Sequence, residues 1–327
     1  MRVAIVGCGL ISEAHLRAYA ANSERARVVV CCDPVRERAE KAASTAGGAR
    51  VTTEFAEVLA DPEVDSIDLL TPHAHHMEGV IAIARAGKHV LCQKPLARNL
   101  EEAEAMVAAV REAGTTLFYA EMNRTAPNAV AARRAIDQGM VGQVAGLQAT
   151  YAHWQGGEIL KTAWRYDPAE AGGGQLLDGG IHFLDMLLHL GGPVAGVMCH
   201  TNRLRPELGG EDTATLSLRY EAGHLGTLFS THASNCWLPD AGCVVFGTEG
   251  MLTLGGRHGA LALHRRGQEP EVLLGERGDI FVEMVSAYLD TVIDGKPSVS
   301  PPEIGVETLA VVLAAYASAR ERREVTL

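Results

Sequence analysis

The chain has 327 residues, of which 47% are hydrophobic and 21% are charged, and this length and composition suit two globular domains. Its formal net charge of -11 argues against a nucleic-acid partner, because no basic stripe is present to displace counterions from phosphates. Its seven cysteines include no C-x-x-C pair and no signal peptide or long apolar run is apparent, so we expect a soluble, cytoplasmic protein that contacts no membrane.

The first residues predict a dinucleotide-binding turn. A buried strand over residues 2–6 ends in Gly7 and Gly9, and a helix over residues 12–21 follows at once. Gly7 permits the tight turn, and Gly9 has no Cβ to keep a pyrophosphate from the backbone amides at the helix N-terminus. Ser12 stands where a third Gly or Ala is commonest in this pattern, which is a mild departure.

An acidic residue stands at the end of the second predicted strand. Asp33 follows a strand over residues 27–32 and lies 24 residues after Gly9, near the spacing of about 20 residues for a ribose-binding acid. A carboxylate there accepts from the adenosine 2′-hydroxyl and repels a 2′-phosphate, which favours NAD over NADP. Arg36 and Arg38 follow closely and favour NADP, and Asp33 could instead only cap the next helix.

Strands and helices alternate as far as residue 120. Helices are expected over residues 35–47, 54–60, 76–86 and 99–112, and strands over residues 50–53, 64–70, 89–92 and 115–120. This rhythm predicts a doubly wound parallel sheet, which binds ligands at the carboxyl ends of its strands. The residues that each follow a strand should therefore lie along one edge of the sheet: Gly7, Asp33, Thr71, Lys94 and Glu121.

The chain changes character after a boundary near Ala120. We expect a helix over 125–139, closing helices over 280–294 and 304–320, and strands over 144–154, 194–202, 212–220, 225–233, 242–246, 250–254 and 260–264. Short turns between these strands predict a largely antiparallel sheet, one face of which a partner subunit could cover. The fold class is thus α/β, with a Rossmann domain over residues 1–120 and an α+β domain over residues 121–327.

A polar stripe runs along the apolar helix expected over residues 175–190. Asp178, His182, Asp185 and His189 recur at intervals of four, three and four residues and share one face. Burying such a stripe costs free energy unless it is paired or faces a wet cleft. We expect Asp178 and His182 to be functional, because the glycines before them let another group approach, and the other two to be structural.

Three histidines at positions 73, 75 and 76 suggest a metal site at first sight. Histidines so close together at a helix start point in different directions, and no ligand set with zinc spacing accompanies them. We therefore expect no metal, and a histidine beside a bound nicotinamide ring instead.

Motifs along the whole chain resemble those of the Gfo/Idh/MocA family of sugar and polyol dehydrogenases. They are the segments 7–12 (GCGLIS), 71–76 (TPHAHH), 86–90 (AGKHV), 94–95 (KP), 123–124 (NR) with Pro127, 139–142 (GMVG), 164–165 (WR), 172–174 (GGG) and 178–182 (DGGIH). By this resemblance, Lys94, Asp178 and His182 match the catalytic Lys, Asp and His of the family. Gln93 stands where the family usually has Glu, which removes a negative charge beside Lys94.

The resemblance implies hydride transfer between NAD and a secondary hydroxyl of a sugar, sugar derivative or cyclitol. His182 would take the hydroxyl proton, Lys94 would stabilise the alkoxide, and Asp178 would orient His182 or a neighbouring hydroxyl. Lys94 and His182 should then converge on one alcohol. The cofactor would be held by Gly7, Gly9, Leu10, Ile11, Asp33, Arg38, Thr71, Pro72, His73, His76, Gln93, Lys94, Glu121 and Asn123.

Polar and aromatic residues of the second domain would complete the substrate pocket. The substrate-binding residues would be Lys94, Asn123, Arg124, His153, Trp154, Trp164, Arg165, Asp178 and His182, with Tyr166, Asn235 and Trp237 as further candidates. Two other readings stay open: a reductase of a keto-sugar or other carbonyl compound that uses NADPH, and a non-catalytic regulator that senses a dinucleotide. The resemblance also implies a homodimer or homotetramer that assembles through the C-terminal sheet.

Overall fold

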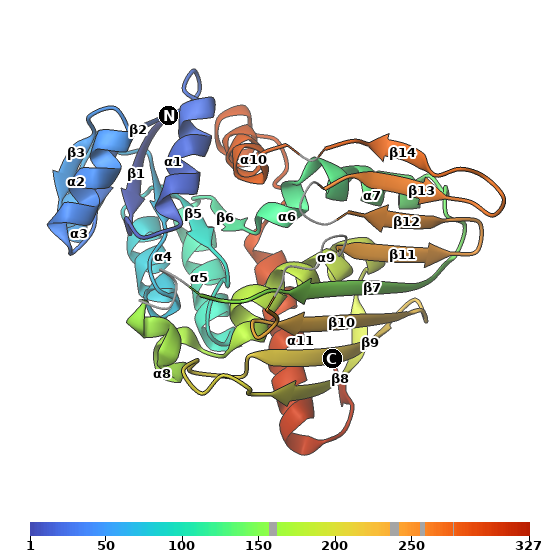
Figure 1. Cartoon of the computed structure of the whole chain (residues 1–327). Coiled ribbons are helices and arrows are strands. Elements are labelled where there is room, and N and C mark those ends of the chain that lie inside the picture. The colour runs from blue at the N-terminus through green and yellow to red at the C-terminus, as the bar shows by residue number, and fades with distance from the viewer. Residues whose placement is uncertain (157–161, 236–241, 256–258, 277) are drawn as a thin grey trace. The chain divides into compact units, whose positions relative to one another are not determined.

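The computed structural model describes residues 1–156, 162–235, 242–255, 259–276 and 278–327 (Figure 1). The chain forms two compact units, the first made of Met1–Thr125 with Asp279–Val306 and the second of Ala126–Gly278 with Glu307–Leu327. The sequence division at residue 120 did not anticipate that a late segment returns to the first unit.

The first unit is built on a parallel six-stranded sheet, as predicted. Its strand order is β3-β2-β1-β4-β5-β6. The strands are β1 (Arg2–Val6), β2 (Arg27–Cys32), β3 (Arg50–Thr52), β4 (Ser66–Leu69), β5 (His89–Gln93) and β6 (Leu117–Ala120). The helices are α1 (Ser12–Ala21), α2 (Arg36–Thr45), α3 (Phe55–Ala60), η1 (His73–His75), α4 (His76–Arg85), α5 (Leu100–Ala113), α6 (Met122–Thr125) and α10 (Ile280–Asp294).

The strand order places a topological switch between β1 and β4. The chain leaves β1 in one direction to form β2 and β3, and β4 to β6 follow in the other direction. With right-handed crossovers, the connecting helices fall on opposite faces of the sheet, and sheets of this kind bind their ligands at the carboxyl ends of the strands beside the switch, here β1 and β4. The register pairs Val6 with Leu69, so Gly7 and Leu70 emerge side by side there.

Helix α10 joins the first unit from the far end of the chain and packs on α1 (Figure 1). Met284, Tyr288 and Leu289 are fully buried in the same core cluster as Val3 and Ile5. Each such side chain contributes about 1.5–3 kcal/mol by leaving water. A hydrogen bond between the Ser66 and Tyr288 hydroxyls links α10 to β4, which satisfies two polar groups inside this core.

The second unit holds a nine-stranded sheet in the order β14-β13-β12-β11-β7-β10-β9-β8-β15. The strands are β7 (Val144–Ala152), β8 (Val194–Asn202), β9 (Thr213–Tyr220), β10 (Leu225–Thr231), β11 (Cys243–Gly247), β12 (Met251–Leu254), β13 (Leu261–His264), β14 (Glu271–Leu274) and β15 (Val325–Thr326). The sheet is mostly antiparallel, as predicted, but β7 and β10 pair in parallel. Neither β14 nor β15 was predicted.

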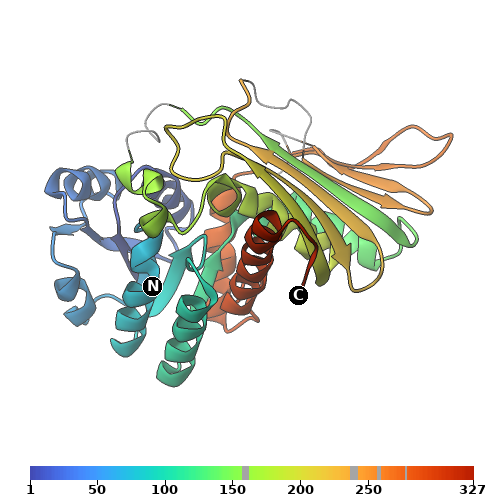
Figure 2. The same cartoon turned by 90° about the horizontal axis from the view of Figure 1, so that it is seen from below.

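Helices cover one face of this second sheet (Figure 2). The helices of this unit are α7 (Pro127–Asp137), η3 (Ala163–Tyr166), α8 (Pro168–Ala171), η4 (Leu176–Gly180), α9 (Ile181–Gly191) and α11 (Pro302–Glu321). Of these, α7 and α9 pack against the strands. The helix expected over residues 175–190 is present and continuous, but its first turn, η4, is π-helical, which was not predicted. Such turns are frequent at functional sites.

Helix α11 has the length and apolar composition that a membrane span requires. One side of this helix nevertheless lies in the protein interior, where Leu309, Val312 and Ala315 are buried. The Ser318 hydroxyl accepts a hydrogen bond of 3.0 Å from the backbone N–H of Cys199 on β8. These contacts are those of a core helix in a folded domain.

Candidate functional site

The two glycines of the first loop have different surroundings. Gly7 has φ of +93°, and a Cβ built there would lie 2.6 Å from the carbonyl oxygen of Leu70. Gly9 has nothing within 4 Å of the place where its Cβ would stand. Gly7 therefore serves the turn itself, and Gly9 leaves an open cradle beside the N-terminus of α1, where a pyrophosphate can meet the backbone amides.

Asp33 is nearly buried at the end of β2, with 4% of its surface exposed. One carboxylate oxygen accepts from the backbone N–H of Cys8 and the other from that of Val35, each at 2.8 Å. The bond to Val35 closes a local turn before α2, but Val35 is itself the N-cap residue of that helix and no side chain caps it, so the capping role considered from the sequence is not observed. The bond to Cys8 also ties the carboxylate to the glycine loop, as a ribose-binding acid requires. Arg38 is exposed on α2.

The turn after β4 carries Thr71, His73 and His76. The Thr71 hydroxyl oxygen is buried with no hydrogen-bond partner among the described residues, so it is available to a ligand. His76 is fully buried, and its ring nitrogens lie 3.0 Å from the Thr71 carbonyl and 2.9 Å from that of Pro95. Burial lowers the pKa of His76. His76 therefore links the turns after β4 and β5, which is a structural role the sequence did not suggest.

Lys94 follows β5 directly and is half-buried. Its backbone N–H donates to the Gln93 side-chain oxygen at 2.8 Å, and its peptide bond to Pro95 is cis. Glu121, after β6, is fully buried and accepts at 3.1 Å from the backbone N–H of Asn123 on α6. The residues after β1, β2, β4, β5 and β6 thus follow the carboxyl ends of one sheet.

In the second unit, the Asp178 carboxylate forms an ion pair with Arg165. The guanidinium Nε lies 3.0 Å from Asp178 Oδ2, and the same guanidinium stacks over the Trp164 ring at 4.3 Å from its centroid. Both charged side chains are mostly shielded, at 28% and 19% exposure. All three residues were candidates in the sequence analysis, but their pairing was not predicted. η3 and η4 are separate elements, and only the folded structure brings their side chains together.

The glycines before Asp178 make room for protein groups. A Cβ at Gly174 would lie 2.3 Å from a Glu211 oxygen, and one at Gly173 would lie 2.6 Å from the Tyr316 hydroxyl. Burial raises the pKa of Glu211, which accepts from the Leu176 N–H at 2.8 Å and from the Tyr316 hydroxyl at 2.9 Å. The sequence analysis expected these glycines to let another group approach. In the structure, the approaching groups are the side chains of Glu211 and Tyr316.

A cluster of aromatic rings packs against the turn that carries Asp178. His153 lies 4.7 Å from His232 between ring centroids, and its Nε2 lies 2.8 Å from the Tyr151 hydroxyl. A Cβ at Gly179 would approach Tyr151 and His232 to within 2.5 and 2.7 Å. Burial lowers the pKa of His153. Tyr151 and His232 were missed because they lie on separate strands, β7 and just after β10.

Trp154 keeps one exposed face, with 49% of its surface accessible. The other face lies on the Arg205 guanidinium, 3.8 Å from the ring centroid. Arg205 is itself buried and donates to the carbonyls of Gln155 and His232 at 2.6 and 3.0 Å. A flat aromatic surface held in this way suits the apolar face of a sugar ring.

His182 lies one turn after Asp178 on α9 and is 9% exposed. Asp185 is fully buried and accepts from the Thr308 hydroxyl at 2.8 Å, in keeping with the structural role expected for it.

The remaining predicted site residues lie elsewhere in the chain. Trp237 lies outside the described residues, and Asn235, the last described residue before Trp237, is exposed. Leu10 and Ile11 lie between Gly9 and the first residue of α1. Leu10 has 52% of its surface exposed, and Ile11 is half-buried.

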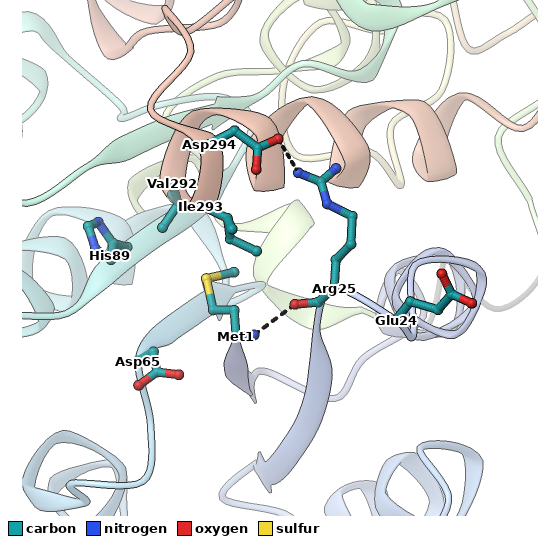
Figure 3. A pocket seen from close by; sticks show the side chains of 8 residues that line it. All are labelled: Met1, Glu24, Arg25, Asp65, His89, Val292, Ile293 and Asp294. Atoms are coloured by element: carbon teal, nitrogen blue, oxygen red, sulfur yellow. Dashed lines mark hydrogen bonds and ion pairs between the residues drawn. The ribbon is translucent and has the colours of Figure 1, made fainter.

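A surface pocket of about 520 Å³ lies elsewhere in the first unit (Figure 3). Met1, Asp65 and His89 line it at the amino ends of β1, β4 and β5, together with Asp294 of α10. It contains none of the predicted site residues, and ligands of parallel sheets bind at the opposite end of the strands. No group of three or more His, Cys, Asp or Glu side chains among the described residues is placed to hold a metal ion.

The residues after the strands fit a dinucleotide. The open cradle at Gly9, the buried acid at Asp33 and the unpaired Thr71 hydroxyl offer a pyrophosphate site, a ribose acceptor and a spare polar group around one switch point. Together with the six-stranded parallel sheet, they define a dinucleotide-binding protein of the Rossmann class.

Family models match both parts of the chain. Residues 1–121 match the model described as an oxidoreductase family with an NAD-binding Rossmann fold, and residues 129–253 match the GFO/IDH/MocA C-terminal domain. The chain belongs to the Gfo/Idh/MocA oxidoreductase family. It is therefore an enzyme with an NAD-binding domain, as the motifs predicted.

Individual relatives cover nearly the whole chain. D-Apiose dehydrogenase from Paraburkholderia graminis is 30% identical, over 99% of this chain and 89% of that protein. 1,5-Anhydro-D-fructose reductase from Ensifer adhaerens is 32% identical, over 86% of each. The crystal structure of the WlbA dehydrogenase from Bordetella pertussis, in complex with NADH and UDP-GlcNAcA, superimposes with a TM-score of 0.87 at 27% identity, over 100% of this chain and 98% of that one.

Proposed function

We propose that this enzyme transfers a hydride between a secondary hydroxyl of a sugar, sugar derivative or cyclitol and NAD. The observation that carries the proposal is the similarity to D-apiose dehydrogenase along 99% of the chain. The carbohydrate ligands and names of the other relatives support the same substrate class.

The proposed chemistry divides between three side chains. When bound, NAD supplies the nicotinamide ring that accepts the hydride. His182 removes the hydroxyl proton as general base, and Lys94 binds the same oxygen and stabilises the developing negative charge. Asp178 orients His182 or a neighbouring hydroxyl, and its ion pair with Arg165 supports this role because it fixes the carboxylate on the turn before His182.

The second unit would supply most of the sugar recognition. We assign this to Trp154, whose stacked ring leaves one face accessible, and to His153, Trp164 and Arg165 around the Asp178 turn. Asn123 and Arg124 of α6 would add hydrogen bonds to the substrate. Rings bearing several hydroxyls call for this mixture of aromatic surface and polar groups.

A panel of sugars, sugar acids and inositols, each followed by NADH absorbance, tests the proposal. We expect turnover with at least one ring that carries a free secondary hydroxyl, and loss of that turnover in His182→Asn. Binding of NAD without turnover of any member, in either direction, would contradict the assignment.

The similarity to 1,5-anhydro-D-fructose reductase favours a second candidate, the reduction of a keto-sugar or other carbonyl compound with NADPH. In that case exposed Arg36 or Arg38 on α2 would have to bind the 2′-phosphate beside Asp33. Turnover measured with NAD and with NADP separates the two, and a clear preference for NADP would reject our first choice.

We also propose that the enzyme is cytoplasmic and forms a homodimer or homotetramer through the second sheet. Assembly through this sheet is supported by two exposed aromatic side chains, Phe229 on β10 and Phe246 on β11. In a single chain, 42% and 40% of their surfaces are accessible. Light scattering on a size-exclusion column tests assembly. Phe229→Glu should lower the measured mass, and an unchanged mass would place the interface elsewhere.

A further inference from the structure

A buried chain of hydrogen bonds leads from the interior of the first unit to Lys94. His15 of α1 and Asp68 of β4 are completely buried, and Gln93 is 7% exposed. His15 Nδ1 lies 2.7 Å from Asp68 Oδ2, and Gln93 Nε2 lies 3.0 Å from His15 Nε2. The Lys94 backbone N–H donates to Gln93 Oε1 at 2.8 Å.

The chemistry of these groups fixes every proton in the chain. A backbone N–H can only donate, so the Gln93 atom that meets Lys94 is the amide oxygen, and the amide NH2 faces His15. That NH2 can only donate, so His15 Nε2 accepts and carries no proton. The one proton of the neutral ring is then on Nδ1, where it is donated to Asp68.

We propose that Gln93 is a positioning residue, whose side-chain amide fixes the main chain of Lys94 to the buried Asp68–His15 pair and holds His15 in its neutral Nδ1–H form. The inference rests on the proposed function in one respect, since Lys94 is there assigned to the substrate oxygen. Gln93 does not contact the substrate oxygen itself. It holds the backbone of Lys94 in place through the Lys94 N–H, and the backbone sets the point from which the Lys94 side chain extends.

A carboxylate at position 93 could not make the same bonds. Glutamate would bring an acceptor to His15 Nε2, itself an acceptor, so one proton must be taken up for the contact to persist. The Asp68 carboxylate, 2.7 Å from Nδ1 on the other side of the ring, favours the charged imidazole, so the proton goes to the ring. His15 would then be an imidazolium between two carboxylates.

Neighbouring titratable groups do not alter this balance. Tyr19 of α1, Cys92 of β5 and Tyr288 of α10 face Asp68, and burial raises the pKa of each of them. All three are therefore neutral near neutral pH. The ring of Phe281, whose centroid lies 5.5 Å from that of His15, is apolar. None of these neighbours supplies or takes a proton in this pH range, so Gln93→Glu keeps the net charge of the cluster constant only if one proton is taken up together with the new carboxyl group.

The proposal is tested by heteronuclear NMR on the full-length enzyme with isotope-labelled histidine. The His15 signal is assigned by its loss in His15→Gln, or by proximity of its ring protons to Phe281 if that variant does not fold. We expect the native enzyme to show a proton on Nδ1 only, and Gln93→Glu to show protons on both nitrogens near neutral pH. Gln138→Glu, at the exposed end of α7, is the matched control and should leave this signal unchanged.

Kinetics test the positioning of Lys94. Gln93→Met removes the acceptor for the Lys94 N–H, and we expect kcat to fall by about tenfold or more. Gln93→Glu keeps an oxygen there and should lose less. A proton on His15 Nε2 in the native enzyme, a bare Nε2 in Gln93→Glu, or a native kcat in Gln93→Met would each overturn the proposal. Because the NMR experiment needs no substrate, it remains decisive even if no sugar is turned over.

Discussion

Alanine substitutions at Gly7 and Gly9 should impair different properties, stability at Gly7 and NAD binding at Gly9, although the two glycines lie in the same loop. At Gly7 a methyl group would meet the Leu70 carbonyl at 2.6 Å on a backbone with φ of +93°. We expect Gly7→Ala to lose about 3 kcal/mol of unfolding free energy, from the clash and the unfavourable conformation together. For a chain of 327 residues, that corresponds to a fall in Tm of roughly 4–5 °C.

At Gly9 the same methyl group meets nothing in the protein, and φ is not positive. Gly9→Ala should therefore change stability by less than about 0.5 kcal/mol. Its methyl group would instead occupy the cradle for the pyrophosphate. Loss of one charge-assisted hydrogen bond, worth about 1.5–3 kcal/mol, weakens NAD binding at least about tenfold.

Thermal unfolding of the two variants without cofactor, followed by NAD titration of each folded protein, measures both quantities. Native-like NAD affinity in Gly9→Ala would show that the loop does not hold the phosphates. Equal destabilisation by the two substitutions would refute the geometry on which both predictions rest.

Three further substitutions test other parts of the site. His182→Asn should bind NAD normally and lose turnover by at least about 100-fold, and a kcat near the native value would remove His182 from the mechanism. Asp33→Asn should shift the ratio of NAD to NADP turnover toward NADP by about tenfold, because the charge that repels a 2′-phosphate is lost; an unchanged ratio would contradict the role of Asp33. Burial raises the pKa of Glu211, so the folded protein binds this proton more tightly than the unfolded one, and stability falls as pH rises through the raised pKa. Glu211→Gln, which keeps the accepting oxygen, should flatten this fall in unfolding measurements from about pH 4 to about pH 8, and an equal slope in both proteins would exclude Glu211 as its source.

Much of the first unit could be predicted because its signals are local. The bounds of β1, α1 and β2 agree with those expected from the sequence, since an apolar β-branched run, a glycine turn and an amphipathic helix each define themselves over a few residues. The residues after the strands then share one edge as a consequence of parallel topology. Helix α10 was also predicted with its observed bounds, Ile280–Asp294.

Other features could not be predicted because they depend on partners far away in the chain. The return of α10 to the first unit depends on contacts with α1 and Ser66, more than 200 residues earlier. The parallel pairing of β7 with β10 leaves no trace in either strand. The π-helical turn η4 lies where Gly179 and Gly180 admit side chains from β7 and β10, and the helical periodicity alone did not reveal it.

Glycines lie beside the proposed cofactor loop of the first unit and beside the proposed catalytic groups of the second, but they serve different purposes. At Gly174 and Gly179 the missing Cβ makes room for Glu211, Tyr151 and His232, so protein atoms fill the space and a methyl group there would disrupt packing. At Gly9 the corresponding space is open. A local sequence pattern indicates only that a close approach occurs. Whether a ligand or a neighbouring strand makes that approach depends on the fold, and this is why substitutions at Gly9 should affect cofactor binding, whereas those at Gly174 and Gly179 should affect stability.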